Sequence, residues 1–328
     1  MTKPVRDKRV IALRNFAISI TIFNIVGYAF LGFEQPWLWP IIALVTGYAL
    51  EIVLEVIGTR GEGRRPRFLG NGFRGLMEFL YPAHITALAV NMLLYVNDQI
   101  LVMIFAVMVA ISGKWLFQAP VRGRMRHFMN PSNLGIAAVL FLFPWVSIAP
   151  PYHFSEYLTG PGDWILPGII LVAGTMLNAK LTGRMWVVAG WLSIFALQAI
   201  VRGVAFDTAV PAALVVMTGV AFVLFTNYMI TDPGTTPSRP LSQFAFGGGA
   251  AALYGLLTGL HIAYGIFFGL VLTCLIRGLF LWALEIVNRT RQQEAVTTGA
   301  GAGQVPSAGS GSGESPGGQP TQREVVRA

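Results

Sequence analysis

The amino-acid sequence predicts an all-α polytopic membrane protein of about ten transmembrane helices. Of the 328 residues, 54% are hydrophobic and 12% are charged, whereas charged residues make up about 25% of ordinary soluble domains. The apolar residues form runs close to the ~20 residues that a helix needs to cross a bilayer. The basic residues gather in the short loops between these runs.

The runs define one membrane domain, residues 11–287, after a basic N-terminal segment, residues 1–10. No small-residue cleavage site follows the first run, so we expect no cleavable signal peptide. We place the transmembrane helices at residues 12–33, 37–57, 76–96, 100–118, 131–149, 164–180, 184–201, 209–230, 242–260 and 262–287.

The basic residues also predict the orientation, because short cytoplasmic loops are enriched in Lys and Arg. With the N-terminus inside, the inner loops hold Arg60, Arg64, Arg65, Arg67, Arg74, Arg122, Arg124, Arg126, Lys180, Arg184 and Arg239. The outer loops carry acidic residues, with Arg202 as the one base. We therefore expect a multi-pass protein of the cell membrane with both termini in the cytoplasm.

The helices can form two halves of five, at about residues 11–150 and 160–287. Because five is odd, the second half would be inverted relative to the first, as in many transporters. The third run of each half opens with a Pro-Ala motif, Pro82-Ala83 in the first half and Pro211-Ala212 in the second. The fifth run of each half follows a polar, glycine-containing stretch, Asn130–Gly135 and His261–Gly265. These features predict an inverted repeat.

The composition changes near residue 288. Residues 297–320 are rich in Gly, Ser, Pro and Gln and have no periodic apolar face. Such a segment cannot bury enough surface to offset the entropy of the chain. We expect a disordered cytoplasmic tail over residues 288–328.

Several kinds of site are disfavoured. The single cysteine, Cys274, allows no intrachain disulfide, thiolate zinc site or iron–sulfur cluster from this chain alone. The sequence contains neither a GxxxxGK[ST] phosphate loop nor an HExxH metal motif. We expect no metal site. The net charge of +8 is attributed to membrane orientation, so no nucleic-acid partner is expected.

The most unusual polar stretch is Asn130-Pro131-Ser132-Asn133, at the start of the fifth run. Irregular backbone at membrane depth must be buried in protein or face a cavity, because lipid cannot satisfy free backbone groups. A helix start offers unpaired N–H groups and a positive dipole end, which suit a phosphate or a reduced ring. Ordinary capping is the alternative. It accounts for one of Asn130, Ser132 and Asn133, but not for all three.

A second polar stretch, Thr231-Asp232-Pro233-Gly234-Thr235-Thr236-Pro237, follows the eighth run. We include Thr231, Asp232 and Thr235 among the candidate ligand-binding residues. A common Asx-Pro turn is the alternative interpretation.

Polar and ionisable groups inside the runs are costly, so each is a functional hypothesis. His84 and Asn91 share one helix face and could hold a planar ligand such as a flavin ring or quinone; interhelical hydrogen bonding is the alternative. Arg277 lies near mid-bilayer and must meet an acid, carbonyl groups or an anionic ligand. Glu51 and Glu55 could relay a proton or hold a cation, and we favour their pairing with the arginines at 60–67.

Three segments resemble the NqrB/RnfD family, membrane subunits of the sodium-pumping NADH:quinone reductase and of the Rnf electron-transport complex. Asn130–Gly135 with the following run to Pro144 resembles the family's NPAM-GY…FP segment. Thr231–Pro237 resembles its ATDP segment, and Ala83–Leu94 is similar to its third helix. The resemblance spans roughly residues 10–287. It implies electron transfer together with other subunits of a membrane complex.

The sequence departs from this family at its best-known cofactor site. Members with covalent flavin mononucleotide (FMN) attach it through a threonine in a Ser-Gly-Ala-Thr-like motif between the fifth and sixth helices. Residues 150–163 contain no such motif. The resemblance therefore argues against covalent FMN and leaves a non-covalent flavin or quinone.

The short outer loop and the Gly/Ser-rich tail resemble the RnfD-like membrane proteins of enediyne biosynthesis clusters. That resemblance implies redox chemistry in antibiotic biosynthesis, as one subunit of an oxidoreductase complex. The alternative, from the polar helix breaks, is a transporter or channel for a small or hydrophobic molecule.

Overall fold

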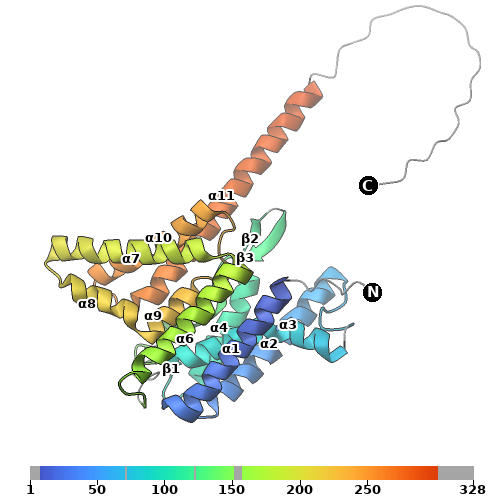
Figure 1. The fold of residues 1–328 in the computed structure, drawn as a ribbon. Coiled ribbons are helices and arrows are strands. Elements are labelled where there is room, and N and C mark those ends of the chain that lie inside the picture. The colour runs from blue at the N-terminus through green and yellow to red at the C-terminus, as the bar shows by residue number, and fades with distance from the viewer. Residues whose placement is uncertain (1–7, 71, 122, 151–156, 302–328) are drawn as a thin grey trace, which may run out of the picture. The chain divides into compact units, whose positions relative to one another are not determined.

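The computed structural model describes residues 8–70, 72–121, 123–150 and 157–301, most of which are helical (Figure 1). The α-helices are α1 (Lys8–Val26), α2 (Trp39–Glu62), α3 (Gly72–Leu93), α4 (Ile100–Leu116), α5 (Pro131–Leu142), α6 (Gly162–Leu177), α7 (Met185–Phe206), α8 (Val210–Val215), α9 (Val220–Leu224), α10 (Pro240–Gly259) and α11 (Gly265–Gly301). Short 3-10 and π-helical segments are η1 (Gly27–Leu31), η3 (Asn178–Thr182), η4 (Val216–Thr218) and η5 (Phe225–Met229). The strands are β1 (Leu94–Tyr95), β2 (Gln118–Val121), β3 (Arg124–His127) and β4 (Ser147–Ile148).

The prediction of an all-α membrane protein is confirmed. Within the described residues, 6 helices are long and apolar enough to cross a membrane. The number rises to 7 if the pair Val210–Thr218 and Val220–Met229, bent by 66°, forms one span. The helices α4 and α5 are shorter apolar helices. Each predicted run contains a helix, and the count of ten spans stays a prediction.

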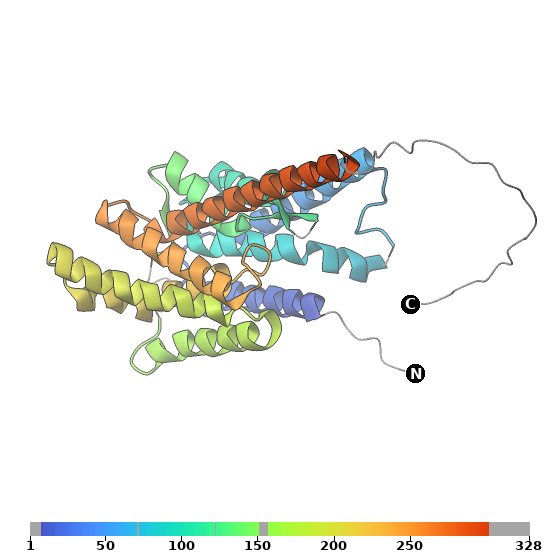
Figure 2. The ribbon, with the colours of Figure 1, turned by 90° about the horizontal axis from the view of Figure 1, so that it is seen from above.

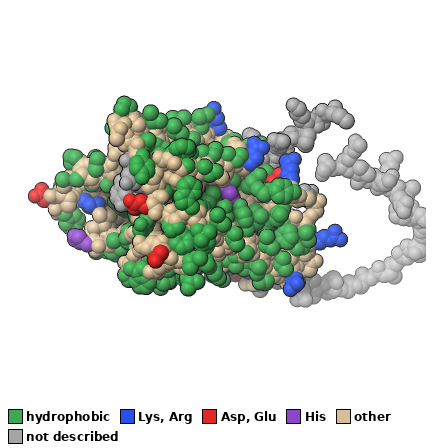
Figure 3. All heavy atoms as spheres, turned by 90° about the horizontal axis from the view of Figure 1, so that it is seen from below, with side chains coloured by type: hydrophobic (Ala, Val, Ile, Leu, Met, Phe, Trp, Pro, Cys, Tyr) green, Lys and Arg blue, Asp and Glu red, His purple; other side chains and the backbone are tan. Residues whose placement is uncertain are grey.

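Large hydrophobic side chains cover the outside of the bundle. On α1 they include Ile18, Ile22 and Ile25, each at least half exposed. Figure 3 shows one face covered mainly by hydrophobic side chains, with Lys and Arg gathered toward one end of it. A soluble monomer rarely exposes so large an apolar surface. Contact with membrane lipid accounts for it.

Two predicted boundaries differ from the structure. The fifth run was expected to continue to residue 149, but α5 ends at Leu142. Pro144 follows, and the residue before a proline is driven out of helical geometry. The tail was expected from residue 288, whereas α11 continues to Gly301. An i,i+4 ion pair, Arg289 with Glu285, supports this extension. Residues 302–328 lie outside the described part of the chain.

Contacts divide the chain into two units, which separate within α11 after Ala283. The buried core lies in the first unit. There α1 packs on α3, and α2 packs on α3 and α4. In the later helices α6 packs on α9, and α7 packs on α8 and α10 (Figure 2). The closest of these packings is α7 on α10, where glycines bring the two backbones together.

A β-hairpin carries the chain from α4 to the start of α5. Strands β2 and β3 pair antiparallel, with Gln118 opposite His127. The Trp282 indole N–H donates to the carbonyl of Gln118 at 2.9 Å, and Asn133 Nδ2 donates to the carbonyl of Phe267 at 2.9 Å. Along the axis of α11, Phe267 and Trp282 are about 22 Å apart, at the helical rise of ~1.5 Å per residue. The start of α5 therefore lies alongside the membrane-spanning part of α11.

Candidate functional site

The start of α5 is a capped helix terminus. Asn130 is the N-cap, with extended backbone, and Pro131 takes the first helical position. Asn130 Oδ1 accepts from the backbone N–H of Asn133 at 3.0 Å and from Ser132 Oγ at 3.2 Å. Capping thus accounts for the Asn130 oxygen and the Ser132 hydroxyl.

The remaining amide groups tie α5 to distant segments. Asn130 Nδ2 donates to the carbonyl of Met229 at 2.8 Å, at the end of η5. Asn133 Nδ2 donates to the carbonyl of Phe267, at the start of α11. Both asparagines are buried, Asn133 to 1% exposure. These bonds cross-link the start of α5 to the end of η5 and to the start of α11.

The Asn133 side-chain oxygen has no hydrogen-bond partner among the described residues. A buried acceptor without a donor costs about 1–3 kcal/mol. Such groups are few in native proteins, and each calls for an explanation, such as a ligand or an ordered water. Capping does not supply one, since the cap is made by Asn130.

The second polar stretch forms a turn held by its own side chains. Asp232 accepts from the backbone N–H of Gly234 at 3.1 Å and from Thr235 Oγ1 at 3.0 Å. The Thr231 hydroxyl donates to the carbonyl of Asn227 at 2.7 Å. These hydrogen bonds are the ones expected of an Asx-Pro turn. The hydroxyl protons of Thr231 and Thr235 are both used within the turn, so neither hydroxyl can donate to another acceptor.

This turn lies close to the hairpin that leads into α5. A Cβ added to Gly234 would lie 2.6 Å from Nε2 of His127 on β3, so the His127 ring lies directly against this glycine. Arg184, between η3 and α7, donates to the carbonyls of Pro237 at 2.8 Å and Pro233 at 3.4 Å. The two polar stretches start 101 residues apart in the chain, at Asn130 and Thr231 (231 − 130), and they lie in one region.

Arg277 completes this region from α11. Cys274, one turn earlier, is buried beside the backbone of Asn130. Gly278, next to Arg277, lies against the ring of Phe128, which follows β3. Within the described residues, Arg277 forms no ion pair with Asp232, whose oxygens are bonded to Gly234 and Thr235. Glu285 pairs with Arg289 instead.

Arg184 is the best-defined cation of the region. Burial lowers the pKa of Arg184 from its usual value, and the nearby charge of Asp232 partly opposes this. The guanidinium remains protonated, because arginine does not lose its proton in proteins. Its Nε is buried without a partner among the described residues.

His84 and Asn91 lie elsewhere, in a network that joins α1, α2 and α3. Thr21 Oγ1 donates to the carbonyl of Ala17, so it accepts from His84 Nε2 at 2.7 Å. His84 Nδ1 is then free to accept from the Tyr48 hydroxyl at 2.5 Å. In this arrangement Nε2 carries a proton and both ring nitrogens are hydrogen-bonded.

Asn91 is bonded in a similar way. Its Nδ2 donates to Asn24 Oδ1 at 2.9 Å, and its Oδ1 accepts from Tyr28 at 3.3 Å. In the described part of the chain, the polar atoms of His84 and Asn91 are bonded to α1, η1 and α2. This is the interhelical bonding given above as the alternative, and contact with a ligand stays a prediction.

The acidic residues of α2 are paired. Glu55 accepts from Arg64 at 2.6 Å and from the backbone N–H of Arg67 at 2.9 Å. Glu51 accepts from Lys114 on α4 at 2.5 Å. The pairing of Glu55 is the one expected. Lys114 was not among the candidate residues, although it is an ionisable residue inside the predicted run 100–118.

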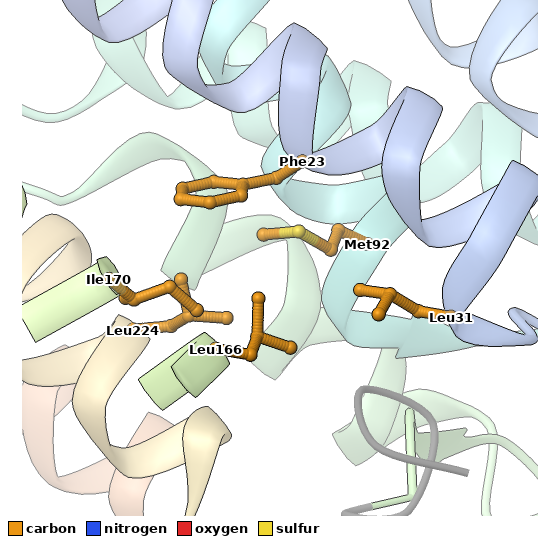
Figure 4. Close-up of a pocket in the computed structure, with 6 residues that line it drawn as sticks. All are labelled: Phe23, Leu31, Met92, Leu166, Ile170 and Leu224. Atoms are coloured by element: carbon orange, nitrogen blue, oxygen red, sulfur yellow. The ribbon is translucent and has the colours of Figure 1, made fainter. Parts of the chain in front are cut away.

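An apolar cavity of about 10 Å³ lies where α1 and α3 meet α6 and α9. Figure 4 shows the side chains around it, Phe23, Leu31, Met92, Leu166, Ile170 and Leu224. A volume near that of one probe sphere admits at most one water. The cavity is lined by none of the predicted site residues and is too small for a ring.

Comparison with known proteins adds no assignment. No protein-family model matches the chain, and no curated protein matches it either. The candidate site therefore depends on the geometry above, and the NqrB/RnfD resemblance stays a prediction.

Proposed function

We propose that the chain is an integral membrane subunit for electron transfer, of the RnfD/NqrB type, acting with other subunits of a membrane complex. It holds a non-covalent flavin or quinone against the start of α5. The reaction it serves is a redox step of secondary metabolism, with enediyne biosynthesis as the specific proposal.

The unpartnered oxygen of Asn133 carries this proposal. It is a buried acceptor at the first turn of a helix that starts beside the membrane-spanning part of α11. A flavin ring presents an N–H, and a reduced quinone presents an O–H, to such an acceptor. The positive end of α5 would favour the reduced, anionic form of either ring.

The inverted repeat is part of the proposal, and the packing supports it. The pairs α1–α3, α2–α3 and α2–α4 correspond in order to α6–α9, α7–α8 and α7–α10. The first helix of each set ends in a π-helical turn, η1 or η3, capped by Gly32 or Gly183 in left-handed geometry. We propose ten membrane segments in two inverted halves, with both termini in the cytoplasm.

The Asn133→Leu substitution should remove the bound ring. We expect the protein purified with its partners to lose about tenfold or more of its flavin or quinone, since a hydrogen bond to a buried acceptor is lost. The absorbance spectrum and the mass of co-purified small molecules measure this directly.

The matched control is Gln35→Leu. Gln35 is also buried, donates through its amide to a backbone carbonyl, and has a side-chain oxygen without a described partner. It precedes α2 and bonds to Leu94 in β1, away from α5. Equal loss in both variants would indicate general instability. A wild-type protein without flavin or quinone absorbance would contradict the proposed function.

A transporter is the second candidate, and the bent pair α8–α9 favours it. Helices interrupted within the membrane are typical of substrate sites in transporters, and this pair is bent by 66°. Proteoliposomes without an electron donor separate the two functions. Flux of a hydrophobic substrate there would favour transport, whereas flavin-dependent reduction without flux would favour electron transfer.

A further inference from the structure

Three arginines from separate segments converge near the start of α5. Arg126 lies on β3, Arg184 precedes α7, and Arg277 lies on α11. Gly234 lies against His127, the neighbour of Arg126, and Arg184 donates to the carbonyl of Pro233 beside it. Gly278, the neighbour of Arg277, lies against the Phe128 ring, two residues after Arg126. Within the described residues, none of the three has a carboxylate at ion-pairing distance.

Asp232, two residues before Gly234, does not neutralise this cluster. Asp232 acts on Arg184, but its two oxygens are bonded to Gly234 and Thr235. Three positive charges and one negative charge leave an excess of two. Like charges gathered in this way repel one another, most strongly where water is scarce.

Arg184 and Arg277 are placed by the fold. Arg184 is fixed by the carbonyls of Pro233 and Pro237. Arg277 belongs to a membrane-spanning helix and is one turn from Cys274, which lies against the Asn130 backbone. An arginine at such a position needs a compensating group, because an unpaired charge within a membrane is costly. The described residues do not supply it.

We propose that Arg126, Arg184 and Arg277 bind a phosphate group. The planar guanidinium matches phosphate oxygens in paired hydrogen bonds, and a phosphate monoester carries about −1.5 to −2 charges near neutral pH. The group comes from the headgroup of an anionic phospholipid or from a free phosphate in solution. This inference does not depend on the redox function proposed above.

The experiment uses the purified full-length chain in a neutral detergent. Thermal unfolding is followed during titration with short-chain phosphatidic acid, inorganic phosphate or, as the neutral control, short-chain phosphatidylcholine. A ligand that binds the folded state alone raises the melting temperature in a saturable way. We expect this with phosphatidic acid and not with phosphatidylcholine.

Substitutions then locate the site. We expect Arg126→Gln and Arg277→Gln each to raise the dissociation constant about tenfold, the effect of losing one charged hydrogen bond. Arg124→Gln is the matched control, since Arg124 is exposed on the same strand as Arg126. It should leave the affinity unchanged. Arg126 is itself exposed, so its variant should fold even if Arg277→Gln does not.

The two sources are separated by the titrations. Saturable stabilisation by inorganic phosphate as well as by phosphatidic acid assigns a free phosphate site; stabilisation by the lipid alone assigns a headgroup site. The proposal is overturned if neither ligand stabilises the protein, if phosphatidylcholine acts equally well, or if Arg126→Gln binds as tightly as the wild type.

Discussion

We expect Gly247→Ala to destabilise the folded protein by about 3 kcal/mol, the upper range for overpacking a close-packed interior. A Cβ at Gly247 would lie against the carbonyl of Val187 and 2.8 Å from the backbone nitrogen of Trp191. Both atoms are backbone, so helix α7 itself would have to move. Unfolding of the purified protein in mixed micelles, titrated with a denaturing detergent, measures the change.

The control lies two residues away on the same helix. At Gly249 the closest atom to an added Cβ is Thr273 Cγ2, at 4.0 Å, which is ordinary van der Waals contact. Gly249→Ala should therefore change the free energy of unfolding by less than about 1 kcal/mol, the helix-propensity difference. Similar losses at both positions would show that α10 does not pack on α7 through Gly247.

The second large effect is expected at Glu55. Its side chain is 2% exposed and pairs with Arg64, and it also accepts the backbone N–H of Arg67. Removing one partner of a buried pair leaves the other charge uncompensated and costs about 3–5 kcal/mol. We expect Glu55→Ala to lower the free energy of unfolding by about 3 kcal/mol, the lower end because Arg64 is partly exposed.

Glu62→Ala is the matched control for Glu55. Glu62 pairs with the same arginine but is 60% exposed, and exposed pairs contribute about 0–1 kcal/mol. The loss at Glu62 should be small in the same detergent titration. A loss at Glu55 no larger than that at Glu62 would contradict a structural role for the buried pair.

The class of the protein followed from composition because the lipid phase acts on every residue of a span. The run at residues 37–57 is mainly apolar, with Glu51 and Glu55 near its inner end, and it lies mostly within α2. The pairing of Glu55 with the arginines after α2 was predictable too, since both lie close together in the chain. Lys114 as the partner of Glu51 was not, because it comes from another helix.

The residues of the candidate site were predictable from the sequence, but their hydrogen-bond partners were not. Asn130, Ser132 and Asn133 were recognised because polar groups are costly beside apolar runs. Their division into a cap and an unpartnered acceptor depends on Met229 and Phe267, which carry no polar side chain and contribute only carbonyls. Main-chain groups are present at every position, so no pattern in the sequence indicates which of them a distant side chain will meet.

The proximity of Arg126, Arg184 and Arg277 was likewise not predictable from the sequence. Arg126 and Arg184 were read from the sequence as loop charges that set orientation, and this accounts for their presence. Their approach to Arg277 depends on how β3, the α6–α7 connection and α11 pack. The sequence by itself determined the membrane class, the helical runs and the costly polar residues, since these depend on local composition. The tertiary structure alone decided which of those residues share a site, because that depends on contacts between segments a hundred residues apart.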